Sequence, residues 1–387
     1  MRHILGNMKT PAHGRTGRCH PVPPVLRSWQ EVQSRLGVAP PAGLPIVSSG
    51  ATYVMAQELA WLDASHFAVG RWDGSMSIFQ FNQSPQLGPV IAKAVNTPSA
   101  EGVQMITLLV PGLFVTSNDA QSMIVWQSPS RQWSDLVSVQ TLAYSSTLGV
   151  ANSGASYVTP NGATLFLIVG HAGGFVTIWQ GGPDGSALAL SQTVDVRSAT
   201  PVNPWGLHNV RGVGLVSATD SAGFVITGSE DGDLCLVRVP DGTIASRIVY
   251  NPTAQRGINS LAVSEGNLLV ANCAVGSADS NLWSYSVDPL SGSIVPTGSA
   301  KLVADPTRAQ VFNFDVIWGQ YADGPCWFSA TEEGYLWMGT ATAGGGIAII
   351  GSQKVTSPLG AAIGMGPPSN LALVAYDLYE FDTGAGA

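Results

Sequence analysis

The hydrophobic and polar residues of this chain follow a short pattern that returns along most of its length. The stretch GFVTIWQGGPDG, from Gly174 to Gly185, shows it: an alternating apolar run that ends in an aromatic residue, followed by a turn rich in glycine and aspartate. Such alternation predicts a β-strand, and Gly, Asn and Asp at short intervals predict tight hairpins. The pattern therefore indicates an all-β chain.

The pattern occurs seven times. Each copy has an apolar strand, a short turn, a second apolar strand, a tight turn and a third strand, and then a more polar run such as VSVQTLAYSS or SALALSQTVDV. The third strands end at intervals of 42 to 58 residues, at Phe79, Trp126, Trp179, Val237, Tyr285, Gly339 and Phe381. Four strands per unit at this period predict a seven-bladed β-propeller of four-stranded antiparallel blades, each covering its neighbours' apolar faces. The polar fourth strand would protect the outer edge of each blade.

The two ends of the chain are predicted to meet in one blade. The seventh unit reaches Ala387 without a fourth strand of its own, and the residues around 44–50, LPIVSSG, are placed to supply it. We therefore expect a propeller over residues 44–387 that is closed by an N-terminal strand. A basic, proline-rich arm over residues 1–43 would precede it.

The arm contains one segment with helical periodicity. The sequence SWQEVQSRLG predicts a short amphipathic helix near 28–36, in which Ser28 and Glu31 form a capping box and Trp29 lies on the apolar face. A helix this short needs a surface to pack on. That surface is either the propeller itself or the groove of a partner protein, which makes Trp29 a candidate partner contact.

The turns between second and third strands resemble those of the WD-repeat family. GSEDGDLCLVRV is close to the family's Ser-x-Asp-Gly turn, and RWDGSMSIFQF matches its Asp-Gly step. The resemblance covers about residues 50–387. The matching turn positions are Asp73, Gly74, Asp119, Ser229, Asp231, Gly232 and Asp279.

The same resemblance implies a structural hydrogen-bond network in the fourth blade. His208 stands in LHN where the family carries its Gly-His pair, so His208, Ser229 and Asp231 would form the network. The chain also departs from the family pattern. Val237 replaces the preferred Trp, and the Gly-His pair is absent from six blades. The propeller prediction does not depend on these positions, because it rests on the repeat.

Charge and cysteine content exclude several classes of protein. The 387 residues carry a net charge of −8, while residues 1–27 hold five basic residues and no acid, so the body of the chain is acidic. An acidic body argues against nucleic-acid binding.

No apolar run reaches the ~18 residues of a membrane-spanning helix, so we expect no membrane insertion. The four cysteines form no C-x-x-C pair, which argues against zinc or redox sites and fits a cytoplasmic protein. The alternative is an organelle protein targeted through the basic arm.

No arrangement of residues in the sequence indicates catalysis. There is no Ser-His-Asp spacing, phosphate loop or nucleophile elbow, and neither His66 nor His171 has a neighbouring cluster of acids. The aspartates lie in or beside turns, where they cap the backbone. We therefore expect no catalytic residue, no metal and no cofactor. The alternative is a propeller enzyme, or a binder of small ligands or glycans, that uses the central channel.

Several large side chains stand where a core does not explain them. Trp and Arg dominate the energetics of protein interfaces, and they occur together at two places in or near turns. The candidate partner contacts are Arg71, Trp72, Arg131, Trp133, Trp205 and Trp29. The alternative is that these rings seal the seams between blades. The sequence as a whole favours a non-catalytic scaffold or recognition module for a protein or peptide, within a multi-protein assembly.

Overall fold

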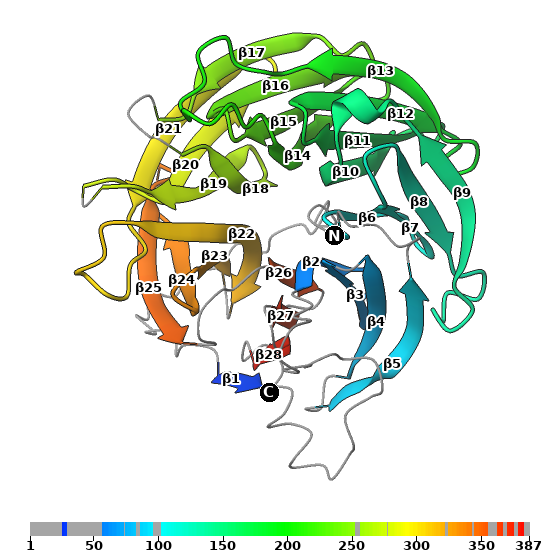
Figure 1. Cartoon of the computed structure of the whole chain (residues 1–387), viewed down its shortest axis with the longest axis horizontal. Helices are drawn as coiled ribbons and strands as arrows, with labels where there is room; N and C mark the ends of the chain where they lie inside the picture. Colours follow the sequence, from blue (N-terminus) through cyan, green and yellow to red (C-terminus); the bar gives the residue numbers. More distant parts are fainter. Residues whose placement is uncertain are drawn as a thin grey trace, which may run out of the picture.

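The computed structural model confirms an all-β chain built from four-stranded antiparallel blades (Figure 1). Within the described residues, 28 strands and one short 3-10 helix, η1 (Ser146–Leu148), account for the regular structure. The described residues are 25–28, 56–72, 74–82, 86–95, 102–251, 256–276, 278–321, 324–342, 344–354, 362–366, 370–374 and 378–382.

In the first six blades the chain starts at the innermost strand and passes outward to the outermost one, and in the last blade the outermost strand comes from the N-terminal part of the chain. The innermost strands are β2 (Ala56–Trp61), β6 (Ile106–Val110), β10 (Ala151–Val158), β14 (Val210–Ala218), β18 (Ile258–Ser264), β22 (Val311–Tyr321) and β26 (Ala362–Gly366). The second strands are β3 (His66–Arg71), β7 (Leu113–Ser117), β11 (Leu165–His171), β15 (Gly223–Ser229), β19 (Asn267–Ala274), β23 (Gly324–Thr331) and β27 (Asn370–Val374).

The outer half of each blade is formed by the next two strands. The third strands are β4 (Ser75–Asn82), β8 (Ser122–Gln127), β12 (Phe175–Gly181), β16 (Asp233–Val239), β20 (Leu282–Asp288), β24 (Tyr335–Ala341) and β28 (Leu378–Asp382). The outermost strands are β5 (Gln86–Val95), β9 (Val137–Ala143), β13 (Ala189–Asp195), β17 (Ile244–Val249), β21 (Ser293–Ala300), β25 (Ile347–Lys354) and β1 (Val25–Ser28). The polar character predicted for this edge is present in β13, where every side chain except that of Val194 is exposed.

The innermost strands contact one another in sequence around the ring, and β26 contacts β2 (Figure 1). Blades five and six are also joined directly, because β19 pairs with β22 through Cys273 and Phe312. Among the second strands, every residue of β3, β7 and β11 is buried. Apolar side chains from facing blades share common clusters, one of which joins Met105 and Leu109 to Leu167 and Val169. The core therefore lies in the seams between blades, as the repeat requires.

The closing strand differs from the predicted one. β1, Val25–Ser28, pairs antiparallel with β28 and completes the last blade, so the segment that closes the propeller lies inside the predicted arm. Residues 44–50, which the sequence favoured for this role, are outside the described residues. Ser28 is the last residue of β1 rather than a helix cap, and the rest of the predicted helix, 29–36, is also outside them.

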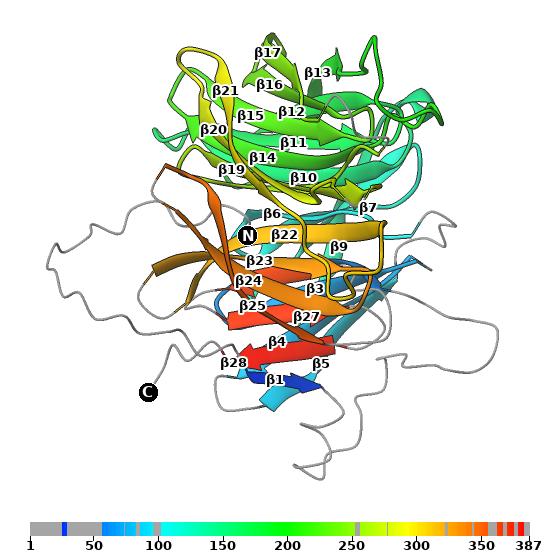
Figure 2. The ribbon, with the colours of Figure 1, turned by 90° about the vertical axis from the view of Figure 1, so that its left-hand side faces the viewer.

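The antiparallel order gives the ring two distinct faces (Figure 2). Turns from second to third strands and connections from one blade to the next lie at one end, which we call the mouth face. Turns from first to second and from third to fourth strands lie at the other end, the opposite face. Residues far apart in the sequence therefore gather on one face according to which connection carries them.

Candidate functional site

A cavity of about 630 Å³ lies at the mouth face, around the first residues of the innermost strands. Every blade contributes to its lining, so the cavity is the entrance of the central channel. One lining residue from each blade, in chain order, is Gln57, Gln104, Asn152, Arg211, Asn259, Phe314 and Ala362. Its volume falls within the range of ordinary ligand sites, roughly 300–1,000 Å³.

Carboxamide side chains recur at the inner wall of this cavity. They stand at or just before the start of five innermost strands, namely at Gln57, Gln104, Asn152, Asn209 and Asn259. Asn152 is buried, its Nδ2 donates to Asn209 Oδ1 over 3.4 Å, and its own Oδ1 accepts no hydrogen bond within the described residues. Because a carboxamide has both donors and an acceptor, this wall can pair with a peptide backbone or with hydroxyl groups.

Two half-exposed tryptophans stand on the rim. Trp72, in the turn between β3 and β4, is 45% exposed, and Trp205, in the connection between β13 and β14, is 50% exposed. Leu207 beside Trp205 is exposed as well. Such side chains are costly to leave in water and are typical anchors of interfaces.

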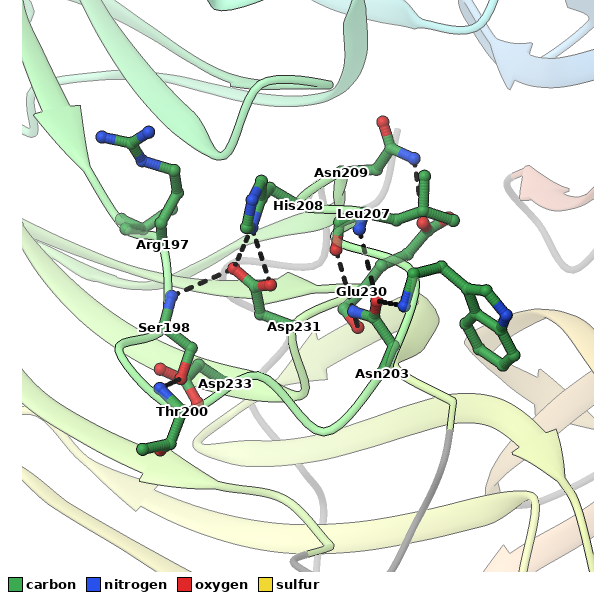
Figure 3. A network of polar contacts seen from close by, with 12 residues as sticks. Arg197, Ser198, Thr200, Asn203, Leu207, His208, Asn209, Glu230, Asp231 and Asp233 are labelled. Carbon is green, nitrogen blue, oxygen red and sulfur yellow. Dashed lines mark hydrogen bonds and ion pairs between the residues drawn. The ribbon is translucent and has the colours of Figure 1, made fainter.

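The loop that carries Trp205 is held in shape by Asn203 (Figure 3). Asn203 Oδ1 accepts hydrogen bonds from the backbone N–H groups of Trp205 (3.1 Å) and Leu207 (3.2 Å). Its Nδ2 donates to the carbonyl oxygens of Leu207 (2.9 Å) and Glu230 (2.6 Å). Gly206 has φ +67°, a value that favours glycine. The indole is therefore presented by an ordered loop, which lowers the entropy cost of binding.

Most charged groups of the cavity already have partners. Glu230 accepts from Arg211 Nε and from Asn209 Nδ2, both over 2.9 Å. Asp315 is buried and accepts from the hydroxyl of Ser260 and from the backbone N–H of Ile363, which belongs to the last blade. These acids therefore hold neighbouring blades together at the mouth.

Arg256 is different, because its guanidinium lies over two aromatic rings. Its Cζ is 4.3 Å from the ring centre of Trp205 and 4.9 Å from that of Phe312, and Phe312 stacks in turn on Phe314. The three rings come from two separate parts of the chain, and Arg256 from a third. Sequence reasoning missed Arg256, Phe312 and Phe314, because no local motif marks residues that meet only in the folded ring.

The predicted network of the fourth blade forms in part (Figure 3). Asp231 is fully buried, with His208 Nδ1 2.8 Å from its Oδ1, and the backbone N–H of Ser198 donates to its Oδ2 over 3.0 Å. Ser229 does not take part, because its buried hydroxyl has no hydrogen-bond partner among the described residues. With Val237 at the aromatic position, no indole is present there to donate to it.

A fuller network lies in the third blade, where the sequence offered no Gly-His or Asp signal. His171 Nε2 is 2.8 Å from Thr177 Oγ1, and Trp179 Nε1 donates to the same hydroxyl over 2.9 Å. Burial lowers the pKa of His171 to about 4, and the acceptor Gly149 O only partly opposes this shift. His171 is therefore a packed, neutral histidine. A threonine facing the third-strand tryptophan was the signal that could have revealed the network.

Two of the other three turn aspartates, Asp119 and Asp279, bind backbone and side chains near their own turns. Asp119 Oδ1 accepts from the N–H of Gln121 over 2.7 Å. Asp279 Oδ1 accepts from Asn251 Nδ2 over 3.0 Å and from the N–H of Ser280. Asp73 lies outside the described residues.

Two of the proposed partner contacts are buried, which corrects the prediction for them. Arg71 is 3% exposed, and its guanidinium donates to the hydroxyl of Ser77 over 3.1 Å inside the first blade. Trp133 is 1% exposed, and its Nε1 donates to Asp63 Oδ2 over 2.6 Å across the seam between blades one and two. Trp133 thus follows the seam alternative, and Arg71 is a buried residue within its own blade.

The remaining candidates separate by face. Trp72 and Trp205 stand on the mouth face, at the cavity. Arg131 is exposed in the connection between β8 and β9, on the opposite face, and Trp29 lies outside the described residues. The six residues therefore do not form one surface.

Three further findings concern metal ligands, cysteines and membrane-spanning helices. In the part of the chain that the structure describes, no three His, Cys, Asp or Glu side chains gather as metal ligands would. Cys235, Cys273 and Cys326 are free and buried, and burial raises the pKa of each thiol to about 12. Among the same residues, no helix has the length and apolar character needed to cross a bilayer.

Comparison with known proteins identifies the fold. No family model and no curated protein matches the sequence. Among solved structures, the chain is similar to the WD40 β-propeller domain of Doa1, with a TM-score of 0.58 and 12% sequence identity over 85% of this chain and 92% of that one. At this identity the likeness concerns the fold alone, and it confirms the WD-repeat-like propeller predicted from the repeat.

Proposed function

We propose that this chain is a non-catalytic interaction module that binds a protein or peptide at the mouth of its central channel. The observation that carries the proposal is the cavity, which has half-exposed Trp72 and Trp205 on its rim and carboxamides along its wall. Exposed aromatic anchors around polar groups that can pair with a backbone are the features of a peptide-binding surface. The propeller supplies the rigid frame, and membership of a multi-protein assembly remains part of the proposal.

The test is a quantitative affinity purification of the full chain from its native source. In the double variant Trp72→Ala with Trp205→Ala, we expect the specific partners to be depleted about tenfold or more, since each anchor contributes about 1 kcal/mol or more. The control replaces two exposed apolar residues outside the cavity, Val137→Ala with Leu290→Ala, and should retain the partners. Equal recovery by both double variants would contradict the proposal.

A second candidate function rests on the same cavity. Tryptophan beside asparagine and glutamine can also hold a sugar or another small hydroxylated ligand, and about 630 Å³ is enough for one. A glycan array probed with the wild-type chain distinguishes the two candidates. Binding of one glycan class that is lost in Trp205→Ala would favour the ligand binder.

A further inference from the structure

Arg256 is held in a fixed place by contacts on several sides. Its carbonyl oxygen accepts a hydrogen bond from the Tyr250 hydroxyl over 2.5 Å, and its guanidinium lies over the rings of Trp205 and Phe312. The side chain is half-buried at the edge of the cavity. A guanidinium stacked in this way uses its π face for the rings, and its N–H donors stay along its edge.

No described residue accepts a hydrogen bond from this guanidinium. The other two arginines that are buried or partly buried among the described side chains both have an acceptor: Arg71 donates to Ser77 and Arg211 to Glu230. Several exposed arginines also pair with an acid, as Arg247 does with Asp233. Arg256 instead combines partial burial, fixed orientation and unused donors, and its position lines the cavity.

The unused edge of an arginine matches one ligand best. Two parallel N–H donors fit the two oxygens of a carboxylate, and the stacking rings fix the fork before the ligand arrives. The surrounding charges limit the ligand further. Glu58, Glu230 and Asp315 face Arg211 and Arg256 around the cavity, so its lining carries one more acid than base. A doubly charged phosphate or a run of acids would be repelled, whereas one carboxylate can be accommodated.

We propose that Arg256 binds the carboxylate of a single Asp or Glu side chain in a partner peptide, whose backbone pairs with the carboxamides of the cavity wall. This inference rests on the proposed function, because it names the chemistry of the partner at that same site. It makes Arg256 the residue that selects among peptides, while Trp72 and Trp205 supply contact area. The partner segment is then largely uncharged, with one acid at a defined position.

The test starts from a phage-displayed library of random peptides selected on the full chain. In each selected peptide every Glu or Asp is replaced by Gln or Asn, and binding is measured by fluorescence anisotropy to the wild type, to Arg256→Gln and to Arg238→Gln. Arg238 is exposed and lies outside the cavity, so Arg238→Gln removes one positive charge elsewhere and serves as the matched control. We expect one acid-to-amide replacement to weaken binding about 10- to 100-fold on the wild type and the control. On Arg256→Gln the same replacement should change binding less than about twofold.

Four outcomes would contradict the inference, and they differ in what they leave standing. If peptides bind but the acid-to-amide loss is equal on wild type and Arg256→Gln, the carboxylate assignment fails and the proposed function stands. If phosphoserine at the same position binds more tightly than Glu, the site takes a phosphate rather than a carboxylate. If the wild type selects no peptide, both the inference and the proposed function fail. Arg256→Lys keeps the charge without the planar fork, so binding as tight as wild type would contradict the stacked-fork geometry.

Discussion

Trp133 and Trp205 look alike in the sequence and have opposite places in the molecule. Each lies in a connection near polar and turn-forming residues. Trp133 is sealed between two blades and donates to Asp63, whereas Trp205 stands half-exposed at the cavity against Arg256. The first connection joins a third to a fourth strand, and the second leads from one blade into the next. The difference shows that the type of connection that carries a tryptophan, rather than its local sequence, decides on which face of this propeller the tryptophan lies.

The largest expected effect is the difference in stability between the protein variants that lack Trp133 and those that lack Trp205. Trp133→Ala should lower the free energy of unfolding by about 3–5 kcal/mol, because it empties a buried site and removes the indole donor from Asp63, which keeps its bonds to His66 and Ser65. Trp205→Ala should cost no more than about 1 kcal/mol, mainly the lost contact with Arg256. Urea unfolding followed by fluorescence measures both. Equal losses would mean that Trp205 is structural as well.

The next effect concerns pH, through the buried His171 near the mouth face. Its pKa is lowered to about 4, so the native state keeps it neutral while the unfolded chain takes up a proton near pH 6.5. The free energy of unfolding should therefore fall as the pH drops from about 6.5 to about 4, by roughly 3 kcal/mol. His171→Gln should flatten the curve in that window, and urea midpoints across pH measure it. An unchanged slope would exclude His171 as its source.

At the opposite face, Asp63 affects the free energy of unfolding over a lower pH range than His171 does. Burial raises the pKa of Asp63, but hydrogen bonds from His66, Trp133 and the Ser65 backbone outweigh it and bring the pKa to about 2. Its stabilisation is present above about pH 4 and is lost as the pH falls toward 2. Asp63→Asn should cost roughly 1–2 kcal/mol at pH 7, allowing for its partial exposure. The deficit should shrink below pH 4.

Asp288→Asn is the matched control for this substitution, because Asp288 is exposed and bonds only within its own turn. It should cost less than Asp63→Asn at neutral pH. If Asp288→Asn lowers the free energy of unfolding as much as Asp63→Asn does, then the hydrogen bond from Trp133 to Asp63 across the seam adds no stability beyond that of the aspartate's bonds within its own turn.

The smallest effect is expected at Ser229, near the mouth face. Its buried hydroxyl has no partner in the described structure, so Ser229→Ala should change the free energy of unfolding by no more than about 0.5 kcal/mol. Thr177→Val is the matched comparison, because Thr177 bonds both His171 and Trp179, and it should cost about 1–3 kcal/mol. A large loss in Ser229→Ala would restore Ser229 to the network of the fourth blade.

The architecture was predictable because its signals are local. Alternation, turn residues and the polar fourth strand all act within about ten residues, so the four-stranded units and the polar outer edge could be recognised from the sequence. His208 and Asp231 were identified through a family turn that also lies within one blade. The closing strand was misplaced, because Val25–Ser28 is chosen by its pairing with β28 across almost the whole chain.

The sequence by itself determined the strands, their turns and the need for blades to cover one another, since these follow from hydrophobic periodicity and backbone preference. Only the tertiary structure decided which side chains share a face. Trp205, Arg256 and Phe312 come from separate connections and strands and meet at one wall of the cavity, while Trp133 is enclosed by a neighbouring blade. The reason is that burial and charge pairing depend on neighbours far away in the sequence, which ring closure brings together.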